Sequence, residues 1–294
     1  MTTTQSVKYF IAKILGFVPD SLMLRLQYLI KLKRFLNLRN PKRFTEKIQW
    51  YKAYYRNNAM LDCTDKYLAR VVCAQRLGTD KYLNEVYQVC DDASEIDFDR
   101  LPNAFVIKTT DGGNGENILV CRDKQLIDKD KVIKEINKWR HKKYEIISRE
   151  WAYKGAHNSR IIVEKLLVDP NNSDNSIDDY KFLCFNGKFQ YLWIDKDRYS
   201  KHKRGFWNEN LVFLNDVRSD HPTFELAPEL PSNIDEMISI AEKISEGFPF
   251  ARIDLYNIEG RIYFGEITFY PWSGYVQYYP DEFDLELGKY FVIS

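Results

Sequence analysis

Residues 250–268, FARIDLYNIEGRIYFGEIT, carry the pattern on which our interpretation of the fold depends. Two strand-like apolar runs flank a short turn and predict an antiparallel hairpin. Side chains alternate along a strand, so Arg252 and Asp254 project from one face of the first strand. A three-residue loop at 258–260, with glycine last, pairs Arg252 with Glu266 and places Asp254 diagonal to Glu266 on that face.

These acids need partners, because a buried carboxylate is costly unless it is paired or bound to a cation. An ion pair between Arg252 and Glu266 accounts for one acid and leaves Asp254 without a partner. Mg²⁺ takes carboxylate oxygens together with nucleotide phosphates, and it accounts for both acids. The hairpin therefore predicts a magnesium site at Asp254 and Glu266, with a structural ion pair as the alternative.

A glycine-rich loop, DGGNGE at 111–116, lies between two strand-like runs. The exposed backbone N–H groups of Gly112, Gly113 and Gly115 are suited to closing over phosphates. The chain has no GxxxxGK[ST] motif, and a strand rather than a helix follows the loop. Alone, the loop is equally typical of a loose hairpin turn.

Cations accompany the predicted strands. Lys108 lies three residues before the glycine loop in an apolar run, where it can contact phosphate or extend from a strand edge into solvent. Lys181 occupies another apolar run, and Arg198 and Arg204 follow the next strand. Each can neutralise a transferring phosphoryl group or an acidic substrate, although a surface position is the more common one for such residues.

Antiparallel hairpins and single helices predict an α+β fold, because a doubly wound parallel sheet needs strand–helix alternation that is missing here. Asn186-Gly187 between two apolar runs is a strong hairpin signal. Helical periodicity is found at about 6–60, with breaks at Pro19 and Asn40-Pro41, and again at 62–78, 132–139 and 233–246.

Composition excludes several classes of protein. The chain of 294 residues is 45% hydrophobic and 29% charged, and no stretch approaches the roughly 20 apolar residues of a membrane span. Its five cysteines form no CxxC pair, which predicts a reducing compartment rather than a disulfide framework or zinc site. We find no secretory signal, so we expect a cytoplasmic protein that is not integral to a membrane.

The first 45 residues are strongly basic, with nine Lys or Arg against the single acid Asp20. Two readings remain open. The segment can be a helical subdomain that docks through its apolar residues, or its charged face can attract an anionic glycan or lipid surface. Nucleic acid is not expected, because no recognition motif accompanies the charge.

Taken together, these patterns resemble the ATP-grasp enzymes, and more narrowly their TupA-like branch, which is named for teichuronopeptide synthesis. The resemblance runs from about residue 38 to the C-terminus. The segments that carry it are NPKRFTEKIQWYK, CTDKYLAR, FDRLPNAFVIKTT, REWAYK, RIIVEKLL, DYKFLCFNGK, GFPFARIDLY and IYFGEITFYPWSG.

The resemblance implies an ATP-grasp fold in which two α+β lobes with antiparallel sheets grip ATP. We divide the chain into an N-terminal helical region at 1–100, a small ATP-binding lobe at 101–168 and a large lobe with the metal site at 169–294.

The resemblance also implies a role for individual residues. Lys108 would contact the α- and β-phosphates, and Gly112, Gly113 and Gly115 would cover them. Lys181 and Arg252 would face the γ-phosphate as catalytic residues, and Asp254 and Glu266 would bind Mg²⁺. Adenine would be held by Glu164 and the backbone of Lys165 to Leu167, and the ribose by Asp169. The usual Glu-x-Asn metal pair is Glu266-Ile267-Thr268 here, and Asp111 stands where many relatives have His.

The activity implied is ATP-dependent ligation of a carboxylate to an amine through an acyl phosphate. The family context suggests a uronic acid of a surface polysaccharide and an amino acid or peptide amine, with Arg198 and Arg204 as substrate contacts. A peripheral position at the inner membrane surface would suit a lipid-linked glycan.

Two other functions compete with this one. Asp195-Lys196-Asp197 after an apolar strand is typical of glycosyltransferases that hold a metal and a sugar diphosphate. A glycan-binding module would explain the 15% aromatic content but not the set of Lys108, Lys181, Asp254 and Glu266.

Overall fold

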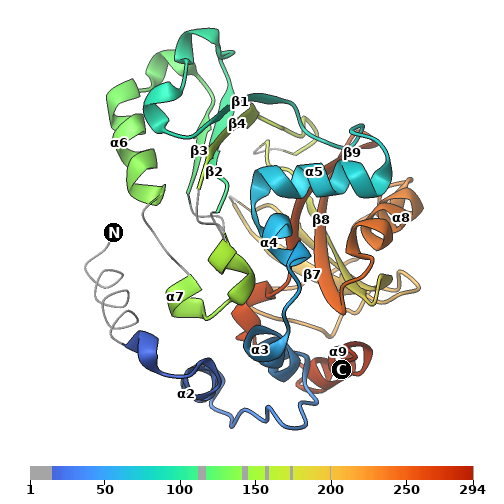
Figure 1. Ribbon diagram of the computed structural model, residues 1–294. Coiled ribbons are helices and arrows are strands. Elements are labelled where there is room, and N and C mark those ends of the chain that lie inside the picture. The colour runs from blue at the N-terminus through green and yellow to red at the C-terminus, as the bar shows by residue number, and fades with distance from the viewer. Residues whose placement is uncertain are drawn as a thin grey trace.

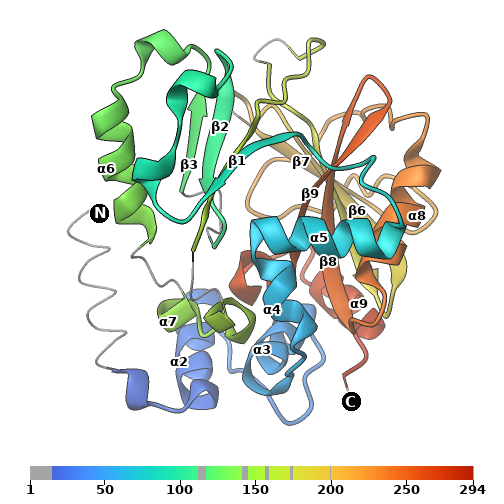
Figure 2. The ribbon, with the colours of Figure 1, turned by 45° about the horizontal axis from the view of Figure 1, so that its top comes forward.

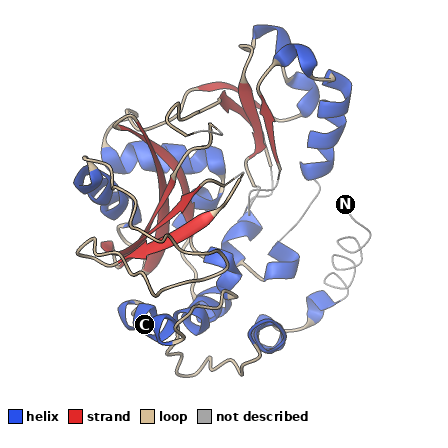
Figure 3. Ribbon diagram, turned by 180° about the vertical axis from the view of Figure 1, so that it is seen from behind, coloured by secondary structure: helices blue, strands red, loops and turns tan. Residues whose placement is uncertain are grey.

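A computed structural model of the chain describes residues 15–111, 117–140, 145–155, 159–172, 175–198 and 200–293. It contains two antiparallel sheets with helices packed around them, as predicted for an α+β protein (Figures 1 and 3). No helix in these ranges is long and apolar enough to span a membrane. The α-helices are α2 Asp20–Leu32, α3 Phe44–Tyr54, α4 Ala59–Thr64, α5 Lys66–Leu77, α6 Lys129–Arg140, α7 Glu145–Ser148, α8 Ile234–Ser245 and α9 Glu282–Tyr290. The 3₁₀ helices are η1 Leu15–Phe17, η2 Ala93–Glu95, η3 Phe98–Arg100, η4 Lys124–Leu126, η5 Trp151–Gly155 and η6 Pro271–Gly274.

The smaller sheet has the strand order β1-β4-β2-β3. Its strands are β1 Val86–Cys90, β2 Phe105–Thr109, β3 Ile118–Cys121 and β4 Ile161–Lys165. Helix α6 covers one face through Val132 and Ile136, which pack into the core of this sheet. Figure 2 shows α6 on the outer side of the sheet. The sequence analysis missed β1, so the small sheet begins before the boundary we placed at residue 101.

The larger sheet has the strand order β7-β6-β5-β8-β9. Its strands are β5 Asp179–Phe185, β6 Lys188–Lys196, β7 Lys203–Trp207, β8 Phe250–Ile258 and β9 Arg261–Thr268. Asn186 and Gly187 form the predicted turn between β5 and β6, with φ angles of 50° and 75°. The sequence analysis gave no strand at β7.

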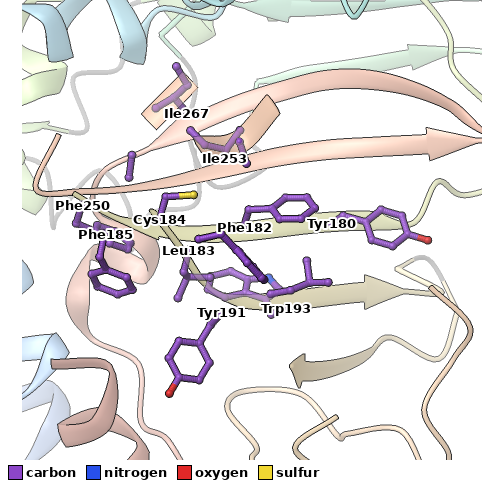
Figure 4. Packing of buried hydrophobic residues seen from close by; sticks show 14 of the residues in the cluster. Tyr180, Phe182, Leu183, Cys184, Phe185, Tyr191, Trp193, Phe250, Ile253 and Ile267 are labelled. Carbon is purple, nitrogen blue, oxygen red and sulfur yellow. The ribbon is translucent and has the colours of Figure 1, made fainter. Parts of the chain in front are cut away.

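One face of the larger sheet is apolar. Phe182, Ile253 and Ile267 lie on neighbouring strands in one row and are buried. Helices α4, α5 and α8 pack on this sheet, and Figure 4 shows side chains of the cluster on β5, β6, β8 and β9. Because residues alternate along a strand, the intervening positions project from the opposite face, where the charged residues lie.

Helices α3, α4 and α5 belong to the core of the large sheet, whereas α2 packs in a separate cluster with Leu36 and Leu38. Helix α3 packs against α9, as Figure 1 shows, and α5 packs against α8. Phe44, Ile48 and Tyr51 of α3 are fully buried in the same cluster as the strands of the large sheet. The predicted helix breaks are confirmed, because α2 begins after Pro19 and no helix spans Asn40-Pro41. The helix predicted at 62–78 is instead two helices, α4 and α5, divided at Asp65, and α5 ends at Gly78, whose φ is 70°.

The loop between β8 and β9 differs from our expectation. It has two residues, Glu259 and Gly260, and Ile258 pairs with Arg261. An even loop alone would send Asp254 and Glu266 to opposite faces. A β-bulge at Gly265 restores the alignment, so that Asp254 pairs directly with Glu266, and Arg252 with Thr268 rather than Glu266.

Candidate active site

A row of side chains crosses the large sheet from β6 to β9. Lys181 pairs with Trp193 on one side and with Asp254 on the other, and Asp254 pairs with Glu266. Directly paired residues project from the same face, so the strands bring these side chains together away from the apolar core. The two acids predicted to share a face do so.

Arg252 connects the two acids. Its guanidinium donates to both carboxylate oxygens of Asp254, at 2.6 Å each, and to Glu266 Oε1 at 2.7 Å. Lys181 Nζ adds a hydrogen bond of 3.0 Å to Asp254. The expectation that Asp254 lacks a protein partner is therefore wrong, since two cations already compensate this buried acid.

The protonation of the two acids differs. Burial alone would raise the pKa of Glu266, but the nearby charges of Arg252, Lys181 and Lys66 lower it to about 2. Burial raises the pKa of Asp254 to about 6 against the opposing charges of Arg252 and Lys181. Glu266 is also the more accessible acid, with 43% of its side chain exposed. Glu266 is thus an ionised carboxylate open to a ligand.

The pair fits a magnesium ion in its chemistry and placement. Asp254 and Glu266 both accept from Arg252 Nη2, so the two carboxylates converge on this guanidinium, and a magnesium ion that they share would lie beside it. Thr268 Oγ1 donates to Glu266 at 3.0 Å and takes the position of the usual Asn. Within the described ranges no three acidic, His or Cys side chains group as a complete metal site. The other ligands would come from phosphate and water, as is usual for Mg²⁺.

Lys181 lies among several carboxylates. Besides Asp254 it contacts Asp179, and Asp195 is 3.9 Å away. Asp179 also accepts from Arg198 at 2.9 Å, and the Arg198 side chain is 40% exposed. Arg198, predicted to contact the substrate, therefore extends from the same charged network toward solvent.

Arg204 lies deeper in the protein than predicted. Its guanidinium is buried and contacts Asp195, at 2.5 and 3.1 Å, and also Asp220. Asp195 and Asp220 thus already pair with the guanidinium that we expected to bind an acidic substrate. The geometry favours a role for Arg204 in positioning these carboxylates.

The same contacts bear on the glycosyltransferase alternative. Asp195 is 1% exposed and is paired with Arg204 and with His202 at 3.0 Å, and Asp197 lies in a turn with φ of 54°. The first acid of the Asp195-Lys196-Asp197 motif is therefore buried in an ion pair and does not face an open metal site.

On the small sheet, Lys108 and Glu164 form an ion pair at 2.7 Å between Nζ and Oε2. Arg70 lies 3.4 Å from the other oxygen of Glu164. The carbonyl of Lys165 accepts from Asn84 Nδ2 at 2.9 Å. Glu164 thus orients Lys108, the predicted phosphate-binding lysine. The contact of Glu164 with adenine stays a prediction.

The remaining nucleotide predictions are only partly placed. Asp169 is buried and accepts from the backbone N–H of Asn171 at 2.9 Å, and Leu167 is partly buried in the segment after β4. Gly112, Gly113 and Gly115 lie outside the described residues. Asp111, at the entrance to that loop, accepts from Ser159 Oγ at 2.5 Å.

Lys66 belongs to the site although the sequence analysis did not select it. It begins α5, and its backbone N–H donates to the Thr110 carbonyl at 2.8 Å, which ties the helix to β2. Burial lowers the pKa of its ammonium. The nearby charge of Glu266 raises this pKa, and that of Lys108 lowers it. Lys66 is therefore within electrostatic reach of Glu266 on the large sheet and Lys108 on the small sheet. A sequence signal existed, because a lysine in the first turn of a helix opposes the helix dipole.

Tyr153, within the REWAYK segment, is a second missed residue. Burial raises the pKa of its phenol well above the usual value, and Glu150 and Glu266 raise it further while Arg252 lowers it. These influences place Tyr153 near the acid pair of the large sheet.

A strap formed by Trp272, Ser273 and Gly274 closes one side of the charged row. All three residues have positive φ angles, of 48°, 58° and 69°. The Trp272 ring packs on Trp193, with a centroid separation of 4.4 Å. Lys52, which is fully buried, donates to both Ser273 O and Ser273 Oγ at 2.6 Å. Helix α3 thus fixes the strap beside the site.

A model of the TupA-like ATP-grasp family matches residues 46–292. The chain belongs to this family. The predicted resemblance and the ATP-grasp fold are confirmed, and the two sheets described above are the small and large lobes of this TupA-like ATP-grasp protein. No curated protein matches the chain.

Solved structures similar to this TupA-like protein include several ligases. The L-amino acid ligase from Bacillus licheniformis is 14% identical over 88% of this chain and 57% of its own, with a TM-score of 0.48. The D-alanine–D-alanine ligase from Bacillus anthracis is 18% identical over 70% and 56%, with a TM-score of 0.40. The chain thus spans little more than half the length of these structures.

Proposed function

We propose that the protein is an ATP-dependent, ADP-forming ligase that joins a carboxylate to an amine. The observation that carries the proposal is the charged row on the large sheet, in which Lys181, Arg252, Asp254 and Glu266 are brought together. Lys66 and Lys108 extend it toward the small sheet. Cations contributed by both sheets are suited to a triphosphate.

The reaction balances as two transfers. A carboxylate oxygen attacks the γ-phosphorus of ATP, the bond to the β-phosphate oxygen breaks, and ADP leaves. The amine nitrogen then attacks the acyl phosphate carbon, the C–O bond to phosphate breaks, and the nitrogen loses a proton. Lys181 and Arg252 neutralise charge on the transferring group, and Lys66 and Lys108 hold the other phosphates. A magnesium ion held by Asp254 and Glu266 would screen the phosphate oxygens.

The nucleotide contacts complete the proposal. Gly112, Gly113 and Gly115 cover the phosphates, Glu164 with the backbone from Lys165 to Leu167 holds adenine, and Asp169 holds the ribose.

The natural substrates belong to the proposal as well. The carboxylate is a uronic acid of a capsule or cell-wall glycan, and the amine belongs to an amino acid or peptide. Arg198, which extends toward solvent from the charged row, is the substrate contact, and no nucleic acid is involved. The enzyme acts in the cytoplasm, at the inner membrane surface where lipid-linked glycans are assembled.

The decisive experiment traps the acyl phosphate. The protein is incubated with ATP, Mg²⁺, hydroxylamine and a panel of uronic acids and amino acids, and acyl hydroxamate and ADP are measured. Asp254→Asn or Glu266→Gln is expected to lower turnover on the order of 10²–10³-fold while the protein stays folded. The matched control is Glu242→Gln, which removes a carboxylate that accepts from the Phe189 N–H at 3.1 Å.

Three outcomes would count against the proposal. Release of AMP and pyrophosphate would contradict the acyl phosphate mechanism. Turnover of a UDP-sugar would support the glycosyltransferase alternative. Equal losses in Glu242→Gln and the two site variants would show that the effect is structural.

A further inference from the structure

Helix α2 is apolar on two sides. Met23, Leu24 and Tyr28 are buried on the side that faces the body of the protein. Leu22, Leu26, Leu29 and Ile30 point outward and are 58%, 50%, 37% and 57% exposed. At about 100° per residue these four side chains fall within an arc of about 100°. We call this arc the α2 outer face.

The ends of this face are also apolar. Phe17, before the helix, is 81% exposed, and Phe35, after it, is 87% exposed. Large apolar side chains that occur singly on a surface are ordinary, but a contiguous row marks an interaction site. Figures 2 and 3 show α2 at the edge of the molecule.

The charged residues in α2 and in the segment after it are almost all basic. Arg25, Lys33 and Arg39 are exposed residues in or after the helix, whereas Lys31 lies over the Tyr275 ring and Arg34 pairs with Asp281. Asp20 is the only acid among the first 45 residues. Its carboxylate is engaged with Arg149 at 3.0 Å and Lys154 at 3.8 Å.

This combination selects among partners. A second copy of the chain would bring like charges together, which opposes self-association through this face. Nucleic acid would use the cations but leave the leucines in water. An anionic bilayer matches both features, because basic side chains meet its head groups while apolar side chains enter the boundary beneath them.

We propose that the α2 outer face docks the protein on the surface of an anionic membrane. The inference rests on burial and charge in α2 and not on the ligase activity, so each can fail without the other. The docking is peripheral, with the helix lying along the surface.

The test uses the full chain and sedimentation with vesicles of phosphatidylcholine, either alone or mixed equally with phosphatidylglycerol. We expect binding to the mixed vesicles at low salt, weakening as the Debye length falls from about 10 Å at 0.1 M to about 3 Å at 1 M salt. The triple variant Leu22→Gln, Leu26→Gln, Ile30→Gln is expected to bind at least about tenfold more weakly. Lys33→Gln with Arg39→Gln should weaken binding to mixed vesicles only.

The matched control replaces Leu126, Leu226 and Val212 with Gln, which are 83%, 85% and 56% exposed elsewhere on the surface. It should bind as wild type does. The proposal is overturned if the full chain binds neither vesicle, or if the triple variant binds as well as the control. It is also wrong if the triple variant converts an oligomer to a monomer without vesicle binding.

Discussion

At the scale of single residues, the placement of Lys66 has the clearest consequence. The charge of Lys108 is one of the influences that lower the pKa of the Lys66 ammonium, and burial is the largest. Bound polyphosphate would relieve this repulsion. Lys66 thus contributes more to the nucleotide complex than to the empty protein.

We therefore expect Lys66→Met to leave the unfolding temperature of the empty protein nearly unchanged and to reduce its rise on adding Mg·ADP. In wild type, nucleotide at 100 times its Kd stabilises by about 2.7 kcal/mol. Thermal unfolding with and without nucleotide measures both effects. Lys81→Met is the control, because Lys81 pairs with Glu236 on the surface with 68% of its side chain exposed. If Mg·ADP raises the unfolding temperature equally in wild type and Lys66→Met, Lys66 does not contribute to nucleotide binding.

Some residues of the site could be predicted from the sequence and others could not. Alternation along a strand placed Arg252 and Asp254 on one face, because that relation is local. Lys66 and Tyr153 join the site only through packing between distant segments, and nothing in a local pattern fixes such contacts. Arg204 was judged accessible because no local pattern shows that Asp195 and Asp220 enclose it.

At the scale of elements, the β8–β9 hairpin depends on one glycine. A Cβ on Gly265 would lie 3.0 Å from the Asp254 carbonyl oxygen and 3.2 Å from the Tyr256 ring. The bulge at this position is what places Asp254 beside Glu266. Sequence predicted the hairpin correctly but not its loop length, since the choice between a two-residue loop with a bulge and a three-residue loop depends on packing in the finished sheet.

Gly265→Ala is expected to cost about 1–3 kcal/mol of unfolding free energy and to displace Glu266, with a large loss of ATP turnover. Gly260→Ala is the matched control, because no atom lies within 4 Å of its Cβ position and only its φ of 83° opposes the substitution. The control should lose about 1 kcal/mol and keep its turnover. Denaturant unfolding and ATPase assays distinguish them, and full activity in Gly265→Ala would show that the bulge does not align the acids.

The strap is the second element with a measurable signature. Burial lowers the pKa of Lys52 from 10.5 to about 7, against the charge of Glu150. Between these values the unfolded chain holds a proton that the folded protein has released, so stability rises with pH across this window, by up to about 1.4 kcal/mol per unit. Lys52→Met should flatten that rise and loosen the strap through the lost contacts with Ser273. Denaturant unfolding between pH 7 and 10 provides the measurement, and an unchanged slope in the variant would contradict it.

At the scale of the whole molecule, the boundary predicted at residue 101 divides segments that share one core. The core of the large lobe includes Phe44, Ile48, Tyr51, Met60 and Cys73, all before residue 101. The family resemblance suggested a boundary at residue 101, but which helix covers which sheet is decided by long-range contacts. A fragment of residues 101–294 would expose the surface that these side chains cover.

We expect the 101–294 fragment to be insoluble or to unfold without cooperativity, because it lacks α3, α4 and α5 and the β1 strand. The control is a chain lacking only residues 2–14, which leaves all of these elements in place. Circular dichroism during heating separates the two. A fragment that unfolds cooperatively would restore the predicted boundary.

The contact between α3 and α9 can form only late in the synthesis of the chain. Phe44 and Tyr51 pack against Phe291, and Lys47 Nζ donates to the carbonyls of Gly288 and Phe291 at 2.7 Å. About 250 residues separate the two partners, so at 5–20 residues per second the ribosome needs roughly ten to fifty seconds to deliver the second after the first. During that time the aromatic face of α3 has no partner from α9 and is available to chaperones or to aggregation.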